Sequence, residues 1–247
     1  MSSVIQKSRI LLEAIKPEKD KEEWSATEIS KKLEIPVQTV HRLLNSLSEA
    51  GFVSKNMETK KFRLSFNLIQ MGFAFRNSLS VYQNSLPIME KLADKAKHCT
   101  CLTVIEDIEG IVVNWNNPTS ALNIDPSLLR NPLHIGAANK VLLTYLPSSL
   151  KDRTISSLCS MDPTLPKEML ENELKLIKQQ GCAITVGEIS EGIADIAAPI
   201  FSWEEKIVAA VSVLIPISTV NTQRIEELVS LTIKAAEDIS EELGFYK

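Results

Sequence analysis

At residues 25–44 the sequence reads SATEISKKLEIPVQTVHRLL, and this stretch decides the fold of the N-terminal part of the chain. Ser25 precedes Glu28 by three residues, the spacing of a capping box, in which each side chain accepts a hydrogen bond from the other residue's backbone N–H. A short helix is therefore predicted to begin at Ser25. It stops before Pro36, because proline disfavours the helical conformation in the residue that precedes it.

A second helix is predicted to follow Pro36, over residues 37–50, with Gly51 as a left-handed cap. Its apolar residues repeat at helical spacing and form one inward face: Val37, Val40, Leu43, Leu44 and Leu47. Residues 52–55 and 61–65 then alternate as strands do and are separated by a polar segment, which predicts a hairpin. Two successive helices followed by a hairpin indicate a winged helix-turn-helix, whose second helix enters the DNA major groove.

The outward face of this second helix carries hydrogen-bonding side chains and no carboxylate: Gln38, Thr39, His41, Arg42 and Asn45. A glutamine amide can pair with adenine and an arginine with guanine or phosphate, so these residue types suit direct base reading. We expect Thr27 and the wing residues Lys60, Lys61 and Arg63 to add contacts to the DNA backbone. An ordinary solvated face is the alternative interpretation.

The charge of the chain is divided along its length. Residues 1–80 hold 13 Lys and Arg against 9 Asp and Glu, a net charge of +4, whereas residues 81–247 hold 14 against 22, a net charge of −8. A basic head on an acidic body indicates that the head alone meets a polyanion. The alternative is a chance imbalance between two solvated surfaces.

The remaining residues predict an α+β domain with a mainly antiparallel sheet. Residues 67–97 are helical in pattern, and we expect Pro87 to kink or restart that helix. Strands are predicted at 102–105, 111–115, 182–186, 193–201 and 207–214, and helices at 137–146, 166–180 and 222–243. We expect a DNA-binding domain over 1–66, a connector helix over 67–80 and a ligand-binding domain over 81–247.

From end to end the chain resembles the IclR-type transcriptional regulators. The similar pieces of its N-terminal part are SATEIS at 25–30, TVHRLL at 39–44, GFV at 51–53 and FRL at 62–64. Those of its C-terminal part are PLHIGAANK at 132–140, Gly187-Glu188, Gly192, IAAPI at 196–200 and AVSV at 210–213. The resemblance implies a dimeric or tetrameric regulator that binds operator DNA and whose GAF-like C-terminal domain binds a small metabolite. We expect a repressor.

The sequence departs from that family at two positions. Asn139 stands where glycine is usual, and Asp195 stands where a small residue commonly faces the ligand. The effector site is expected to comprise Trp115, Gly136, Ala137, Ala138, Asp195, Ser212 and Leu214. Backbone N–H groups at a helix start hold an acidic oxygen, whereas a buried aspartate prefers hydroxyl or ammonium donors. A sugar acid, hydroxy acid or amino acid carries both features, unless Asp195 points outward or caps a turn.

Other kinds of site find little support in the sequence. Cys99, Cys101, Cys159 and Cys182 could in number ligate zinc, but their spacing is not that of a zinc knuckle, and small buried thiols are the favoured interpretation. We expect no cofactor. Catalytic residues are not expected either, because no nucleophile elbow occurs and the three histidines lie in separate segments. The longest apolar run, 207–217, is too short for a membrane span, so we expect a cytoplasmic protein.

Two alternative functions stay open at this point. The C-terminal pocket could belong to an enzyme or a metabolite-binding module that uses the N-terminal domain only for attachment. The chain could also be a regulator that responds to a protein partner, in which case the pocket would be collapsed and dry.

Overall fold

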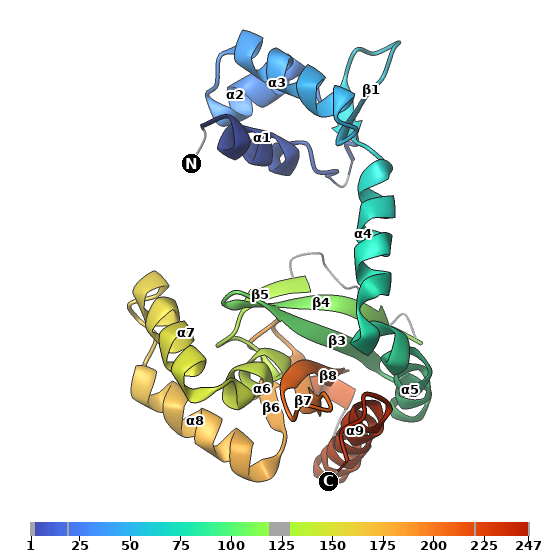
Figure 1. Cartoon of the computed structure of the whole chain (residues 1–247), viewed down its shortest axis with the longest axis vertical. Coiled ribbons are helices and arrows are strands. Elements are labelled where there is room, and N and C mark those ends of the chain that lie inside the picture. The colour runs from blue at the N-terminus through green and yellow to red at the C-terminus, as the bar shows by residue number, and fades with distance from the viewer. Residues whose placement is uncertain (1–2, 19, 119–128, 220, 247) are drawn as a thin grey trace. The chain divides into compact units, whose positions relative to one another are not determined.

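The computed structural model describes residues 3–18, 20–118, 129–219 and 221–246. The chain folds into two compact units, unit 1 over Met1–Ser78 and unit 2 over Leu79–Lys247 (Figure 1). The α+β class, with an N-terminal winged helix-turn-helix and a C-terminal antiparallel sheet, is confirmed.

Unit 1 contains three packed helices, a two-stranded wing and a further helix. The helices are α1 (Ser3–Ala14), α2 (Ala26–Leu33) and α3 (Val37–Glu49), and the wing strands are β1 (Val53–Lys55) and β2 (Phe62–Leu64). They share one core, in which Leu11, Ile29, Leu44 and Phe62 are fully buried. The fourth helix, α4 (Asn67–Ser78), belongs to unit 1 by its contacts and buries none of its residues.

The capping box predicted at the start of α2 is present. The Glu28 N–H donates to the Ser25 Oγ at 3.2 Å, and the Ser25 N–H donates to a Glu28 carboxylate oxygen at 2.7 Å. The residue before the box, Trp24, pairs with Phe62 of the wing through two backbone hydrogen bonds of 2.8 Å each. The first residues of the helix-turn-helix are thus fastened to the hairpin that follows it.

Unit 2 is built on one six-stranded sheet, in which every pair of neighbouring strands is antiparallel. The strand order is β5-β4-β3-β8-β7-β6. The strands are β3 (Cys99–Glu106), β4 (Glu109–Asn116), β5 (Arg130–Pro132), β6 (Ala183–Val186), β7 (Ile193–Phe201) and β8 (Ile207–Pro216).

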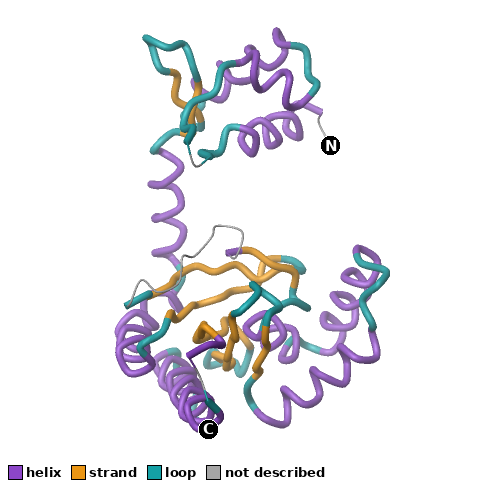
Figure 2. The backbone as a smooth tube through the Cα atoms, turned by 180° about the vertical axis from the view of Figure 1, so that it is seen from behind, coloured by secondary structure: helices purple, strands orange, loops and turns teal. Residues whose placement is uncertain are grey.

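Helices cover both faces of this sheet (Figure 2). On one face lie α5 (Ser80–Ala96) and α9 (Thr222–Glu242); on the other lie α6 (Ala137–Tyr145), α7 (Ser148–Met161) and α8 (Lys167–Gln180). Side chains alternate between faces along a strand. Ile196 and Ala198 therefore pack toward α5 and α9, whereas Asp195 and Ala197 face α6.

The structure corrects the expected break at Pro87. The helical region 67–97 is interrupted at Leu79, between α4 and α5, and Pro87 lies inside α5. Proline has no N–H to give to the carbonyl of Gln83, but both residues are exposed, so water can solvate this turn. The 14-residue helix α7 and the three-residue strand β5 were not predicted from the sequence.

We expect Ser25→Ala to lower the free energy of unfolding of unit 1 by about 1 kcal/mol, because the first turn of α2 loses its cap. Urea-dependent hydrogen exchange of the α2 amides in the full chain measures this change. Ser46→Ala, at an exposed position inside α3, is the matched control and should cause no loss. Equal stability of Ser25→Ala and the parent would contradict a stabilising capping box.

Candidate functional site

The face of α3 that was predicted to read DNA is open to solvent. Gln38, His41 and Arg42 are exposed, whereas Thr39 and Asn45 are half-buried. The side chains of His41 and Asn45 lie 3.2 Å apart, and the His41 ring packs edge-on against Phe62 of the wing. All five side chains thus belong to α3, and His41 joins this helix to the wing.

The wing residues keep their cationic groups near its surface. Lys60 is exposed and Lys61 half-buried, and the Arg63 guanidinium lies 4.6 Å from the Phe66 ring centre. Glu23 fixes the turn of the wing by accepting hydrogen bonds of 2.9 Å from Asn56 and from Thr59. These two bonds lower the pKa of Glu23, so it stays ionised beside the basic wing. Thr27 is exposed in the first turn of α2.

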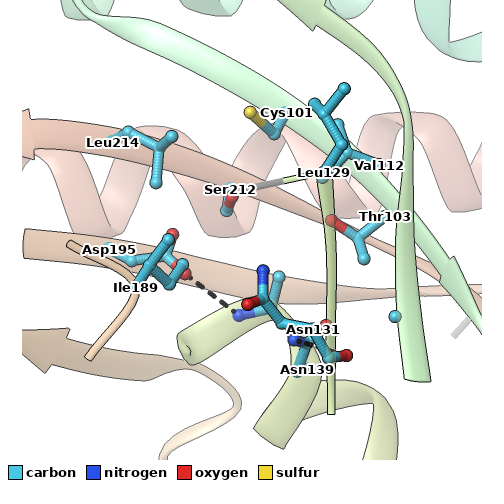
Figure 3. A pocket seen from close by; sticks show the side chains of 12 residues that line it. Cys101, Thr103, Val112, Leu129, Asn131, Asn139, Ile189, Asp195, Ser212 and Leu214 are labelled. Atoms are coloured by element: carbon cyan, nitrogen blue, oxygen red, sulfur yellow. Dashed lines mark hydrogen bonds between the residues drawn. The ribbon is translucent and has the colours of Figure 1, made fainter. Parts of the chain in front are cut away.

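In unit 2 a small cavity lies between the sheet and the start of α6 (Figure 3). Its volume is about 30 Å³, room for roughly two water molecules. The residues around it come from β3, β4, β5, α6, β7, β8 and the turn between β6 and β7, and include Cys101, Thr103, Val112, Asn131, Asn139, Ile189, Asp195, Ser212 and Leu214. Four of the residues expected at an effector site therefore meet here, namely Ala138, Asp195, Ser212 and Leu214.

Strand register explains why these residues meet. Leu214 of β8 pairs with Asp195 of β7 on one side and with Cys99 of β3 on the other, and Ser212 pairs with Cys101. Residues two apart on a strand share a face, so all of them face α6.

Asp195 is the central polar residue of the cavity and is only 2% exposed. One carboxylate oxygen, Oδ2, accepts the N–H groups of Ala137 at 2.9 Å and of Ala138 at 3.3 Å, and Ser212 adds a side-chain hydrogen bond. Among the described residues, the other oxygen, Oδ1, has no hydrogen-bond partner. Burial raises the pKa of Asp195 to about 6, although its three hydrogen bonds act to lower it.

A second carboxylate holds the same helix start from outside. Glu188 accepts the Gly136 N–H at 2.9 Å and pairs with Lys140 at 2.6 Å, and Lys140, only 5% exposed, also pairs with Glu173 at 2.7 Å. The next residue, Ile189, then lies over the cavity. Gly136 has φ of +87°, and a Cβ there would come within 2.7 Å of Ile189, so this close approach requires glycine.

Two expectations about the site are wrong. The N–H groups at the start of α6 are not open to a ligand oxygen, because Asp195 and Glu188 already accept from them. Trp115 does not line the cavity, and its side chain is 47% exposed. In the register of β3 and β4, Trp115 pairs with Cys101 and Val112 pairs with Thr103, and of the two β4 residues only Val112 lines the cavity. Asp195 also points inward, which rules out the outward-facing alternative.

Sequence reasoning assigned no role to Glu188 and Ile189, which lie in the turn between β6 and β7. The Gly187-Glu188 pair directly after a strand could have marked a functional turn. That this turn lies against the start of α6 follows only from the tertiary structure. Asn139 was noticed as a departure. Its side-chain amide donates to the Ile135 carbonyl at 2.7 Å, and a Cβ on Gly110 would come within 1.9 Å of its oxygen. Gly110 and Asn139 therefore fit each other.

The cysteines are free thiols, and three of them are buried. Cys101 hydrogen-bonds to Cys99; this bond and burial raise the pKa of the Cys101 thiol, so it stays protonated.

No cluster of three His, Cys, Asp or Glu able to hold a metal occurs in the described part of the chain. Within the same residues, no helix is long and apolar enough to cross a membrane.

A roomier hollow of about 580 Å³ lies beside α9 and is lined partly by aromatic rings, among them Tyr145, Phe201 and Phe245. Its buried polar side chain, Ser240, already donates to the Ala236 carbonyl and accepts from the Phe201 N–H. Among the described residues, the unpartnered buried carboxylate oxygen lines the Asp195 cavity and not this hollow.

Comparisons with known proteins cover both units. Residues 11–56 match the model of the IclR helix-turn-helix domain, and residues 74–241 match that of the bacterial transcriptional regulator IclR C-terminal domain. The chain is 26% identical to the HTH-type transcriptional regulator KipR of Bacillus subtilis over 85% of this chain and 86% of that protein. It is 24% identical to the transcriptional repressor IclR of Escherichia coli, over 87% of this chain and 81% of that protein.

Solved structures of the same fold span nearly the whole chain. A homologue from Microbacterium hydrocarbonoxydans, complexed with 4-hydroxybenzoate, has a TM-score of 0.79 at 23% identity and covers 98% of this chain and 99% of that one. The Thermotoga maritima IclR structure has a TM-score of 0.78 at 22% identity, with 98% of each chain covered.

The raised pKa of Asp195 has a consequence for stability. The folded state holds this proton up to about pH 6, whereas the unfolded chain releases it near 3.8. Stability from this group is therefore full below 3.8 and is lost as the pH rises toward 6. The quantity to follow is the difference between the unfolding free energies of the parent and of Asp195→Asn. We expect this difference to fall by about 1–3 kcal/mol between pH 4 and 7.

Urea unfolding of both proteins across that pH range measures the difference. Asp162→Asn is the control, because hydrogen bonds from Thr164 lower the pKa of this carboxylate below 3.8, so that it titrates below the pH range used. The same difference should therefore stay nearly constant between pH 4 and 7 for Asp162. A flat difference for Asp195 would show that its proton is not held more tightly in the fold.

Proposed function

This chain belongs to the IclR family of bacterial transcriptional regulators, and we propose that it represses its target genes by binding operator DNA through α3 and the wing. It is a DNA-binding regulator with an effector-binding domain rather than an enzyme. The observation that carries the proposed DNA contact is the exposed face of α3, which holds amide, imidazole and guanidinium groups from Gln38 to Asn45, with a carboxylate only at its last residue, Glu49. The repressor named among its relatives supports the sign of regulation.

Each residue type on this surface has its own task. The Gln38 amide pairs with adenine in the major groove, and Arg42 pairs with guanine or phosphate. Thr39, His41 and Asn45 complete the reading face of α3. Contacts to the DNA backbone come from Thr27 at the start of α2 and from Lys60, Lys61 and Arg63 in the wing.

The effector occupies the Asp195 cavity of unit 2 and shifts the population of DNA-competent molecules. A ligand changes operator affinity only if it binds the competent and incompetent arrangements unequally. The homologue complexed with 4-hydroxybenzoate supports small-molecule binding by this fold. The cavity is small, and the observation that supports an effector over a protein partner is the buried Asp195 oxygen in its wall, which has no hydrogen-bond partner among the described residues.

The regulator acts as a homodimer or a tetramer, joined in part through α4. Four large apolar side chains of this helix are about half exposed or more: Ile69, Met71, Phe73 and Phe75. Met71 and Phe75 are one turn apart and share one face of the helix, and exposed apolar side chains of this kind mark an interface. The occupant is a second copy of the chain, because an operator with two half-sites needs a two-fold symmetric reader.

We expect Gln38→Ala to reduce the preference for one base per half-site by about 1–3 kcal/mol. Lys61→Ala should instead weaken binding to all sequences alike and lower the salt slope by about 1. Fluorescence anisotropy with operator and random duplexes at several salt concentrations measures both effects. Lys91→Ala, at an exposed position of α5, is the control. If both variants bound both duplexes as the parent does, this face would not be the reading face.

We expect Phe75→Glu to reduce the molar mass of the assembly at least two-fold at micromolar concentration, because a charge would enter the apolar interface. Light scattering coupled to size-exclusion chromatography reports the mass. Met161→Glu, at a position of α7 with similar exposure, should leave it unchanged. A parent that is monomeric, or an unchanged mass for Phe75→Glu, would refute association through α4.

A further inference from the structure

The start of α6 already holds carboxylates that belong to the protein. The Gly136 N–H donates to Glu188, and the N–H groups of Ala137 and Ala138 donate to Asp195. These are the donors that a helix offers to an anion from outside. Asp195 therefore occupies the position that a ligand's carboxylate would need.

The described lining of the cavity offers no positive charge to such a ligand. Its polar groups are the Asp195 carboxylate, neutral side chains and the Cys101 thiol, which its raised pKa keeps protonated. The nearby cation, Lys140, is held outside the cavity lining between Glu173 and Glu188. An incoming carboxylate would meet an aspartate at close range without a counter-ion, which is strongly unfavourable in a buried site.

A hydrogen-bond donor would find the opposite situation. Oδ1 of Asp195 is buried, has no partner among the described residues and belongs to a side chain that lines the cavity. An acceptor left in this state costs free energy, which a ligand N–H or O–H would recover. Thr103, Ser212 and Asn131 can orient the rest of a small polar molecule.

We propose that the effector enters through an amine or hydroxyl group that donates to Oδ1 of Asp195, and that Asp195 excludes ligands whose carboxylate must reach the start of α6. This inference rests on the proposed function, because it names the ligand chemistry of the same cavity. Of the sugar acids, hydroxy acids and amino acids expected from the sequence, it retains the hydroxyl or amino group and rejects the acid group as the anchoring one.

The test compares probes of one size and different charge. Ethanolamine, ethylene glycol and glycolate share a two-carbon skeleton. Because ligands with this few atoms bind with affinities near the millimolar range, each is titrated to about 10 mM. Calorimetry on the full chain at pH 7.5 should detect ethanolamine and ethylene glycol binding to the parent at least ten-fold more tightly than glycolate.

The variant Asp195→Ser should reverse this order. Removing the carboxylate frees the N–H groups of Ala137 and Ala138, so glycolate should gain at least ten-fold in affinity while ethanolamine loses as much. Asp152→Ser, at an exposed position of α7, is the matched control and should behave as the parent. A thermal melt without probe shows whether the variant folds, and the comparison of probes on the parent stands without it.

Three results would overturn the inference: tighter binding of glycolate than of ethanolamine to the parent, no heat from any of the three probes, or an unchanged order in folded Asp195→Ser. Anisotropy with operator DNA on the same proteins keeps the two proposals apart. If the parent binds operator DNA but prefers glycolate to ethanolamine, only the proposed ligand class is refuted. If the parent does not bind operator DNA, the proposed function is refuted.

Discussion

The burial of one carboxylate, that of Asp195, is the constraint on which the architecture of unit 2 depends. An ionised carboxylate loses much of its hydration when it is 2% exposed, and it is stable there only with donors supplied by the fold. Two N–H groups at the start of α6 and the Ser212 side chain supply them. The central strands β7 and β8 and helix α6 must therefore keep one relative position.

The same constraint extends to the turn that covers the cavity. Glu188 takes the neighbouring Gly136 N–H and is balanced by Lys140, which in turn binds Glu173. This ion pair network places Ile189 over Asp195. Any molecule that enters must lie between the Asp195 carboxylate, to which it donates a hydrogen bond, and the apolar Ile189 side chain, which it displaces. These two residues together therefore define what can bind.

Unit 1 is stabilised in a simpler way. A local signal, the capping box of Ser25 and Glu28, begins α2, and the backbone pairing of Trp24 with Phe62 joins the helices to the wing. The polar face of α3 takes no part in this core and is left free for recognition, whereas α4 presents apolar side chains that its own unit does not cover.

The sequence by itself determined the winged helix-turn-helix, the α+β class and most strands of the sheet, because caps, turns and side-chain periodicity act over a few residues. It also identified Asp195 and Ser212 as cavity residues, because the strands that carry them resemble the ligand-facing strands of the family. It misplaced the helix break at Pro87, which lies inside α5, whereas the break lies at Leu79. Only the tertiary structure decided that Asp195 itself accepts hydrogen bonds from the start of α6, and that Glu188 accepts one from the same helix start. Each of these contacts joins residues about 50 positions apart, and no local pattern encodes such contacts.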